Sequence, residues 1–160
     1  MEKTPQDNLK RKKLKEEKVQ NDDKNKSNEE NYIPNFIKRY GKEIGLPNLK
    51  MNENNVVSLC FYGKINVDIA YDDKNNQCVL ASPICYIPNK DRGKFYEQLL
   101  ISNNEYNKNG GLNLGIEEKE NRVVLSYTFI ANTFSYLLFK TVLTNFAALS
   151  ERNILKFEEF

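Results

Sequence analysis

The chain contains no histidine and no tryptophan among its 160 residues, and the missing histidine limits its chemistry. Ser-His-Asp and Cys-His catalysis are excluded, and most zinc sites lose a ligand type that they need. Carboxylate or lysine chemistry stays open, with Asp68 and Asp72 as candidates. Both carboxylates fall in or beside a predicted turn or a polar strand face, where a solvated surface role is the simpler interpretation. We therefore expect a protein that is not an enzyme.

Cysteine is scarce as well: only Cys60, Cys78 and Cys85 are present, and none of them has C-x-x-C spacing. An odd number of cysteines, with no apolar segment near Met1 to act as a secretion signal, favours reduced thiols in the cytoplasm. A phosphate loop is missing too, since Gly-Lys pairs such as those at 63–64 and 93–94 lack the upstream glycine. We expect no cofactor and no bound metal.

No long apolar run is free of polar residues. The most hydrophobic window, residues 130–149, contains Lys140 near its middle, together with Asn132 and Asn145. A lysine at the centre of a membrane-spanning helix costs about 2.5–3.5 kcal/mol. The window is therefore predicted to be a core helix, with no membrane span. The net charge of +2 gives no indication that the protein binds nucleic acid or a membrane surface.

Residues 1–31 differ from the rest in composition, with nine Lys/Arg, eight Asp/Glu and almost no apolar side chains. Such a segment cannot bury enough surface to offset its ordering entropy, so we predict a disordered, charged tail. Residues 10–18 within it are locally basic, which fits either a solvated tail or contact with an anionic partner. A folded domain is expected from 32 to 160.

The first part of this domain predicts a helix and then a β-hairpin. In residues 33–44 the apolar side chains recur at helical spacing, Pro34 suits the first turn, and Gly45 suits the end. Residues 56–71 alternate apolar and polar side chains around Gly63. One register places all the apolar side chains on a single face, with the pairs Phe61–Ile65, Leu59–Val67 and Val57–Ile69.

The remaining segments complete an α+β pattern. A third strand near 77–87 contains Pro83, which points to an edge strand or a bulge. A helix through "FYEQLLISNN" (95–104), strands at 112–116 and 122–129, and a helix from about 132 to past 149 follow. The order helix, three strands, helix, two strands, helix predicts an antiparallel sheet with helices packed on it.

The same ordered segments resemble the class I type III secretion chaperones of the Tir-chaperone (CesT-like) family over roughly residues 32–155. The motifs that carry the resemblance are "IGL" at 44–46, a "Y-x-x-LL-x-x-N" helix, Gly110–Gly111 before a strand, and "NRVVL" at 121–125. The helix motif consists of Tyr96, Leu99, Leu100 and Asn103.

This resemblance implies a bacterial, cytoplasmic homodimer that works without ATP and holds the N-terminal segment of a secreted effector in extended form. It also implies that the helix at 95–104 and the strand after it form much of the subunit interface. The implied interface residues are Phe95, Tyr96, Leu99, Leu100, Gly110, Gly111, Leu112 and Leu114. The two apolar pairs of that helix would then divide between their own sheet and the partner subunit.

Binding an extended segment requires apolar grooves and open strand edges. The helix at 33–44 carries more apolar surface than one side needs, so its side chains are candidates for effector binding, with core packing as the alternative. These candidates are Ile33, Phe36, Ile37, Tyr40 and Ile44. The open edge is expected at 56–62 or 78–87. The competing function is an adaptor for anionic surfaces or nucleic acid that acts through residues 10–18.

Overall fold

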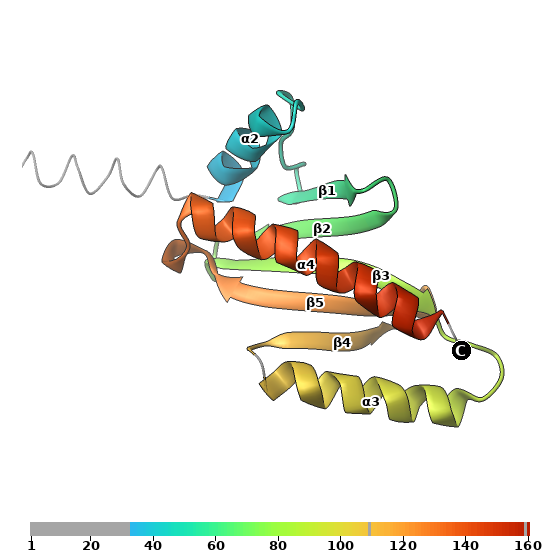
Figure 1. Cartoon of the computed structure of the whole chain (residues 1–160). Coiled ribbons are helices and arrows are strands. Elements are labelled where there is room, and N and C mark those ends of the chain that lie inside the picture. The colour runs from blue at the N-terminus through green and yellow to red at the C-terminus, as the bar shows by residue number, and fades with distance from the viewer. Residues whose placement is uncertain (1–32, 109, 159) are drawn as a thin grey trace, which may run out of the picture.

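The computed structural model describes residues 33–108, 110–158 and 160. The predicted tail, residues 1–31, lies outside the described residues. Three helices and five strands follow one another in the predicted order (Figure 1). Their bounds are α2 Ile33–Glu43, β1 Val56–Phe61, β2 Ile65–Asp72, β3 Gln77–Tyr86, α3 Arg92–Lys108, β4 Leu112–Glu117, β5 Arg122–Ile130 and α4 Tyr136–Phe157. The predicted α+β class is therefore confirmed. Among the described helices, none is long and apolar enough to cross a membrane.

The five strands form one antiparallel sheet in the order β1-β2-β3-β5-β4. The β1–β2 register confirms the prediction, with Val57 opposite Ile69, Leu59 opposite Val67 and Phe61 opposite Ile65. Tyr62 and Gly63 form the tight turn with φ angles of 54° and 71°. A left-handed conformation is easy for glycine and uncommon for tyrosine.

β3 corrects one sequence-based expectation. It lies between β2 and β5, so residues 78–87 are not an open edge. The proline signal nonetheless has a structural counterpart, since the register with β5 shifts between Pro83 and Cys85. A bulge accommodates a residue that cannot donate to the ladder, even in a central strand. Of the two predicted edges, only 56–62 lies at the border of the described sheet.

α4 packs across one face of the sheet, over β2 and β3 (Figure 1). α2 lies beside the first half of α4, and α3 lies along β4. The strands direct their apolar side chains toward α4, which contributes Phe139, Leu143, Phe146 and Ala147 to the same core. The two border strands, β1 and β4, therefore lie at opposite sides of this helix.

α4 begins at Tyr136, later than the predicted start near 132. Residues 131–133 form a single 3-10 turn, and the Ser135 hydroxyl then accepts a hydrogen bond from the Leu138 N–H at 3.2 Å. A serine that caps in this way fixes the first turn of the helix behind it.

Candidate partner-binding surfaces

The apolar stripe of α2 faces the core rather than solvent. Ile33, Phe36 and Ile37 are fully buried, and Tyr40 is nearly so. Phe36 makes an edge contact with the Tyr136 ring at 5.8 Å between centroids and a tilted contact with Phe139 at 5.6 Å. These four candidates for partner binding therefore do not form an open groove in this structure, because their side chains are buried in the core. The fifth, Ile44, is 43% exposed.

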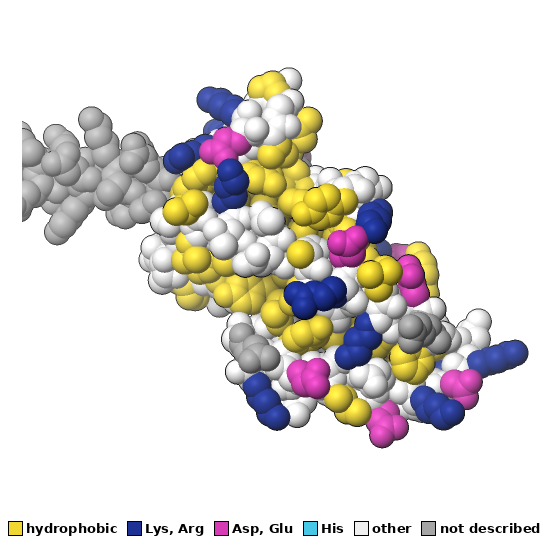
Figure 2. Space-filling model, in the orientation of Figure 1, with side chains coloured by type: hydrophobic (Ala, Val, Ile, Leu, Met, Phe, Trp, Pro, Cys, Tyr) yellow, Lys and Arg dark blue, Asp and Glu magenta, His cyan; other side chains and the backbone are white. Residues whose placement is uncertain are grey.

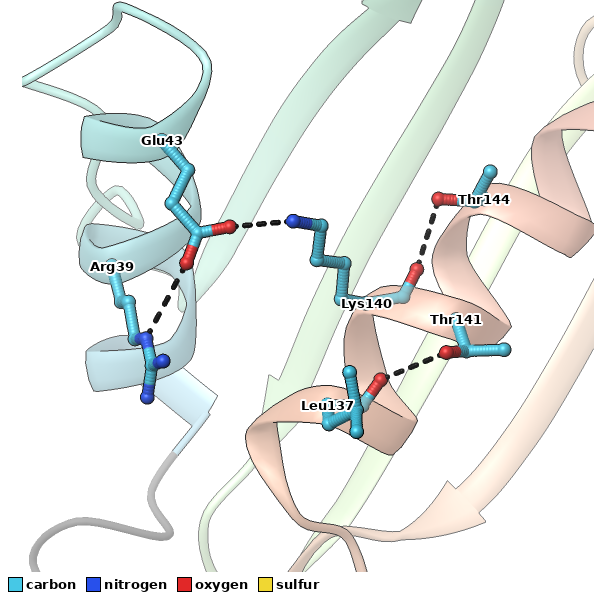
Figure 3. Close-up of polar contacts among 6 residues, drawn as sticks. All are labelled: Arg39, Glu43, Leu137, Lys140, Thr141 and Thr144. Carbon is cyan, nitrogen blue, oxygen red and sulfur yellow. Dashed lines mark hydrogen bonds and ion pairs between the residues drawn. The ribbon is translucent and has the colours of Figure 1, made fainter.

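Polar contacts hold α2 and α4 together at the rim of this aromatic core (Figure 3). Lys140 Nζ donates a hydrogen bond to Glu43 Oε2 at 2.6 Å, and Arg39 Nε lies 3.5 Å from Glu43 Oε1. The hydrogen bond from Lys140 lowers the pKa of Glu43. The Arg39 guanidinium also stacks over the Tyr136 ring at 3.9 Å. The orientation of α2 is thus fixed by both packing and charge.

On the exposed face of α4, Thr141 and Thr144 satisfy their hydroxyls locally. Their Oγ1 atoms donate to the carbonyl oxygens of Leu137 and Lys140, at 3.0 Å each (Figure 3). Hydroxyls bonded back to their own helix are less available to other partners. This turn of α4 consequently presents fewer polar groups than its sequence suggests.

The loop after α2 presents apolar side chains to solvent. Leu46 is half exposed, and its N–H donates to the Gly41 carbonyl at 2.7 Å. A Cβ at Gly41 would lie 2.6 Å from both the Leu46 carbonyl oxygen and the Leu49 Cβ, so the loop returns this closely only because residue 41 is glycine. The space-filling view shows apolar side chains gathered where α2 meets α4 (Figure 2).

The β1–β2 turn carries a further exposed apolar side chain. Tyr62 is largely exposed. The pKa of Tyr40 is raised by burial first, and the Tyr62 hydroxyl adds a further electrostatic contribution against the opposing effect of Lys140. We call Ile44, Leu46 and Tyr62 the α2–β1 surface.

The border strand β1 offers unpaired backbone on the side of the sheet where α2 lies (Figure 1). The Tyr71 N–H donates to the Asn55 carbonyl, which makes 55/71, 57/69 and 59/67 the hydrogen-bonded pairs of the ladder. The N–H and C=O groups of Ser58 and Cys60 then point away from β2. No residue within the described ranges hydrogen-bonds to these four groups. Such an edge is a template for an added strand.

α3 divides its apolar residues between the core and solvent. Phe95 and Leu99 are buried in their own chain, Tyr96 is half-buried, and Leu100 is 68% exposed. Ile101, which the sequence analysis did not single out, is 47% exposed. The run Leu99-Leu100-Ile101 was the available signal, since three consecutive apolar residues cannot all face one side of a helix.

The other residues predicted at the subunit interface lie around the start of β4. Leu114 is buried in the core and Leu112 is half-buried, while Gly110 and Gly111 form the preceding loop with positive φ. A pocket of about 290 Å³ opens between this loop and α4; its lining is Gly110, Leu112, Tyr127, Val142, Asn145, Phe146 and Leu149. A cavity of about 150 Å³ holds benzene, so this pocket can receive an aromatic side chain.

The candidate catalytic carboxylates, Asp68 and Asp72, make only local contacts in the part of the chain that the structure describes. Asp72 accepts hydrogen bonds from the Lys74 and Asn75 backbone within its turn, and its pKa is lowered by Asn75. Asp68 accepts from the Ser58 hydroxyl across the β1–β2 ladder. Among the described residues, no group of three His, Cys, Asp or Glu side chains could hold a metal ion.

The sequence matches the family model described as "Tir chaperone protein (CesT) family" over residues 35–153. The chain belongs to this family. It is therefore a chaperone of the family that the ordered motifs of its sequence predicted. A comparison with curated proteins finds no significant match.

Several solved structures share the fold of this chaperone. The "Crystal Structure of the ExsC-ExsE Complex" contains a chain with 19% sequence identity and a TM-score of 0.67, covering 76% of this chain and 90% of that one. The HopA1–SchA chaperone–effector complex contains one with 13% identity and a TM-score of 0.63, covering 74% and 90%. The Yersinia pestis chaperone SycH in complex with a YscM2 fragment gives 16% identity and a TM-score of 0.56, covering 76% and 98%.

Proposed function

We propose that this chaperone binds an extended segment of a type III secreted effector along the α2–β1 surface and the free edge of β1. The proposal rests on two observations: exposed apolar side chains in the turn after α2, and unpaired backbone on β1, which borders the sheet on the side where α2 lies (Figure 1). Strand addition supplies backbone hydrogen bonds, and apolar side chains beside it select the sequence. Chaperone–effector complexes among proteins of the same fold support this assignment.

The expected energies are sufficient for binding without nucleotide. The four free backbone groups of Ser58 and Cys60 can form four hydrogen bonds, each contributing about 0.5–1.5 kcal/mol net. Full coverage of a leucine such as Leu46 adds about 1.5–3 kcal/mol. These gains offset part of the cost of ordering the effector segment. The protein would then keep its effector unfolded in the bacterial cytoplasm until secretion.

The α2 stripe contributes to this function indirectly. Ile33, Phe36, Ile37 and Tyr40 hold the helix in place, and Ile44 belongs to the surface itself. In this proposal the predicted effector-binding set is therefore reduced to Ile44, extended by Leu46 and Tyr62.

Calorimetric titration tests the proposal. The titrant is the N-terminal third of a secreted protein encoded beside the gene of this chaperone. Leu46→Asp should weaken binding by about tenfold or more. Ser58→Pro should have a similar effect, since it removes an outward N–H without breaking the β1–β2 ladder. Leu155→Asp is the matched control, because Leu155 is a similarly exposed leucine in the last turns of α4. Wild-type affinity in both test variants would refute the site.

We also propose that the chaperone forms a homodimer through the outer face of α3, where Leu100 and Ile101 are exposed. Two adjacent aliphatic side chains that are this exposed to solvent mark a surface that a partner subunit can bury. Leu100→Asp should yield a folded monomer in sedimentation experiments. Leu155→Asp should leave the sedimentation coefficient unchanged. A wild-type protein that sediments as a monomer at tens of micromolar would contradict the dimer.

A further inference from the structure

The outer edge of β4 is partly closed by a side chain from α3. Asn103 Oδ1 accepts a hydrogen bond from the Leu114 N–H at 2.9 Å, and the contact is partly buried. Asn103 lies in the sixth-from-last position of α3, whereas Leu114 lies in the middle of β4. The asparagine therefore takes the place that an incoming strand would need in order to pair with Leu114.

The ladder between β4 and β5 shows which groups point outward. Because the Leu114 N–H is bonded to α3, the Leu114–Leu125 pair is one whose backbone groups do not bond to each other. The alternation then directs the N–H and C=O groups of Leu112, Leu114 and Ile116 away from β5. Asn103 occupies the central one of these three positions. An added strand could not form a continuous ladder there.

α3 is held firmly enough to keep Asn103 in position. Next to it, Ser102 is fully buried and accepts a hydrogen bond from Lys156 Nζ at 2.7 Å. One turn later, the Tyr106 hydroxyl donates to Asn153 Oδ1 at 2.9 Å. Both partners belong to α4, so the helix that carries Asn103 is anchored to the core on its other side.

The edge at β1 is closed only at its first residue. Asn52 accepts from the Val56 N–H through Oδ1 at 3.0 Å, and its own N–H donates to the Val56 carbonyl at 2.8 Å. These bonds satisfy only the first residue of the strand. Ser58 and Cys60 stay open, whereas at β4 the blocked residue is the central one.

We propose that Asn103 is a specificity-determining residue that closes β4 to strand pairing and so restricts strand addition to β1. Only the second half of this inference rests on the proposed function; the closure of β4 is a property of the chaperone alone. It also prevents two copies from pairing edge to edge through β4, a recurrent hazard of exposed strands.

The test compares Asn103→Ala, which removes the acceptor, with Asn103→Asp, whose carboxylate can still accept from the Leu114 N–H. Asn104→Ala is the matched control, because Asn104 is an exposed asparagine one position further along α3. The first readout is amide hydrogen exchange at Leu114, followed by NMR. We expect about tenfold faster exchange in Asn103→Ala, from the loss of one hydrogen bond, and near wild-type exchange in the other two variants.

The second readout is sedimentation velocity over a range of concentrations without any effector. Asn103→Ala should form species larger than those of the wild type, and the other two variants should not. Adding Ile116→Pro to Asn103→Ala should abolish the larger species, since proline removes an outward N–H of β4 and leaves the β4–β5 ladder intact.

Unchanged exchange at Leu114 in Asn103→Ala would overturn the inference, as would a wild-type size distribution. Larger species that persist in the double variant would also overturn it, because they would not depend on the β4 edge. None of these results bears on effector binding at β1. Failure of the inference is therefore distinguishable from failure of the proposed function.

Discussion

Replacing Phe36 with alanine should destabilise the chaperone severely, and the magnitude follows from its surroundings. The side chain is 1% exposed and contacts the rings of both Tyr136 and Phe139. A buried phenylalanine truncated to alanine costs about 3–5 kcal/mol, which includes the cavity left behind. Domains of this size are stable by only about 5–15 kcal/mol in total. The variant should therefore lose a large part of its stability.

Urea denaturation followed by circular dichroism measures this loss. With a typical m-value of about 2 kcal/mol/M, the midpoint should fall by roughly 2 M while the m-value stays the same. Ile44→Ala serves as the control in the turn directly after α2, and its cost should be below about 1 kcal/mol because Ile44 is 43% exposed. Protein concentrations must be equal, since self-association shifts apparent stability.

The outcome separates the two interpretations of α2. A Phe36→Ala variant that unfolds at the wild-type midpoint would show that the α2 stripe does not pack in the core and would restore it as a candidate groove. A large shift with Phe36→Ala and a small one with Ile44→Ala would agree with the buried arrangement.

Three further predictions concern charge, thiols and the tail. The folded-state pKa of Glu43 is depressed by Lys140, so the contribution of this ion pair is complete above the ordinary glutamate pKa and is lost as the pH falls through the lowered value. Carbon-13 titration should show the pKa of Glu43 rising toward its ordinary value in Lys140→Met; no rise would contradict the pairing. Burial raises the pKa of Cys78 to about 12 and that of Cys85 to about 11, so iodoacetamide at pH 8 should modify exposed Cys60 first, as judged by mass spectrometry. Equal labelling of Cys78 in the folded protein would be inconsistent with its burial. Deleting residues 1–31 should change the free energy of unfolding in urea by less than about 0.5 kcal/mol, since so few apolar side chains are lost; a markedly lower midpoint would show that the tail packs on the domain.

The local elements were predictable because their signals lie within a few residues. Strict alternation over 56–71 leaves one register that keeps the apolar side chains together, and the observed β1–β2 pairing is that register. Proline and glycine at the ends of α2 mark its bounds for similar reasons. The element order and the family resemblance followed from these local patterns.

Other features depend on contacts between distant segments, which periodicity does not encode. Pairing of β3 with β5 makes Pro83 part of a central strand. No pattern within residues 77–87 predicts that β5 lies next to this strand. The stripe of α2 has the same pattern whether it faces α4 or a partner, so sequence alone left both open. Asn103 belonged to a recognised motif, yet its contact with Leu114 depends on how α3 lies along β4.

The position of α4 at the far end of the chain from α2 has a consequence for biosynthesis. Glu43 and Lys140 are 97 residues apart, and at translation rates of about 5–20 residues per second the ribosome needs about 5–20 s to cover that interval. During this time Phe36 and its neighbours have no helix to pack against and stay exposed on the nascent polypeptide. The chaperone thus passes through a phase in which part of its own core is uncovered, and this phase ends only when α4 emerges.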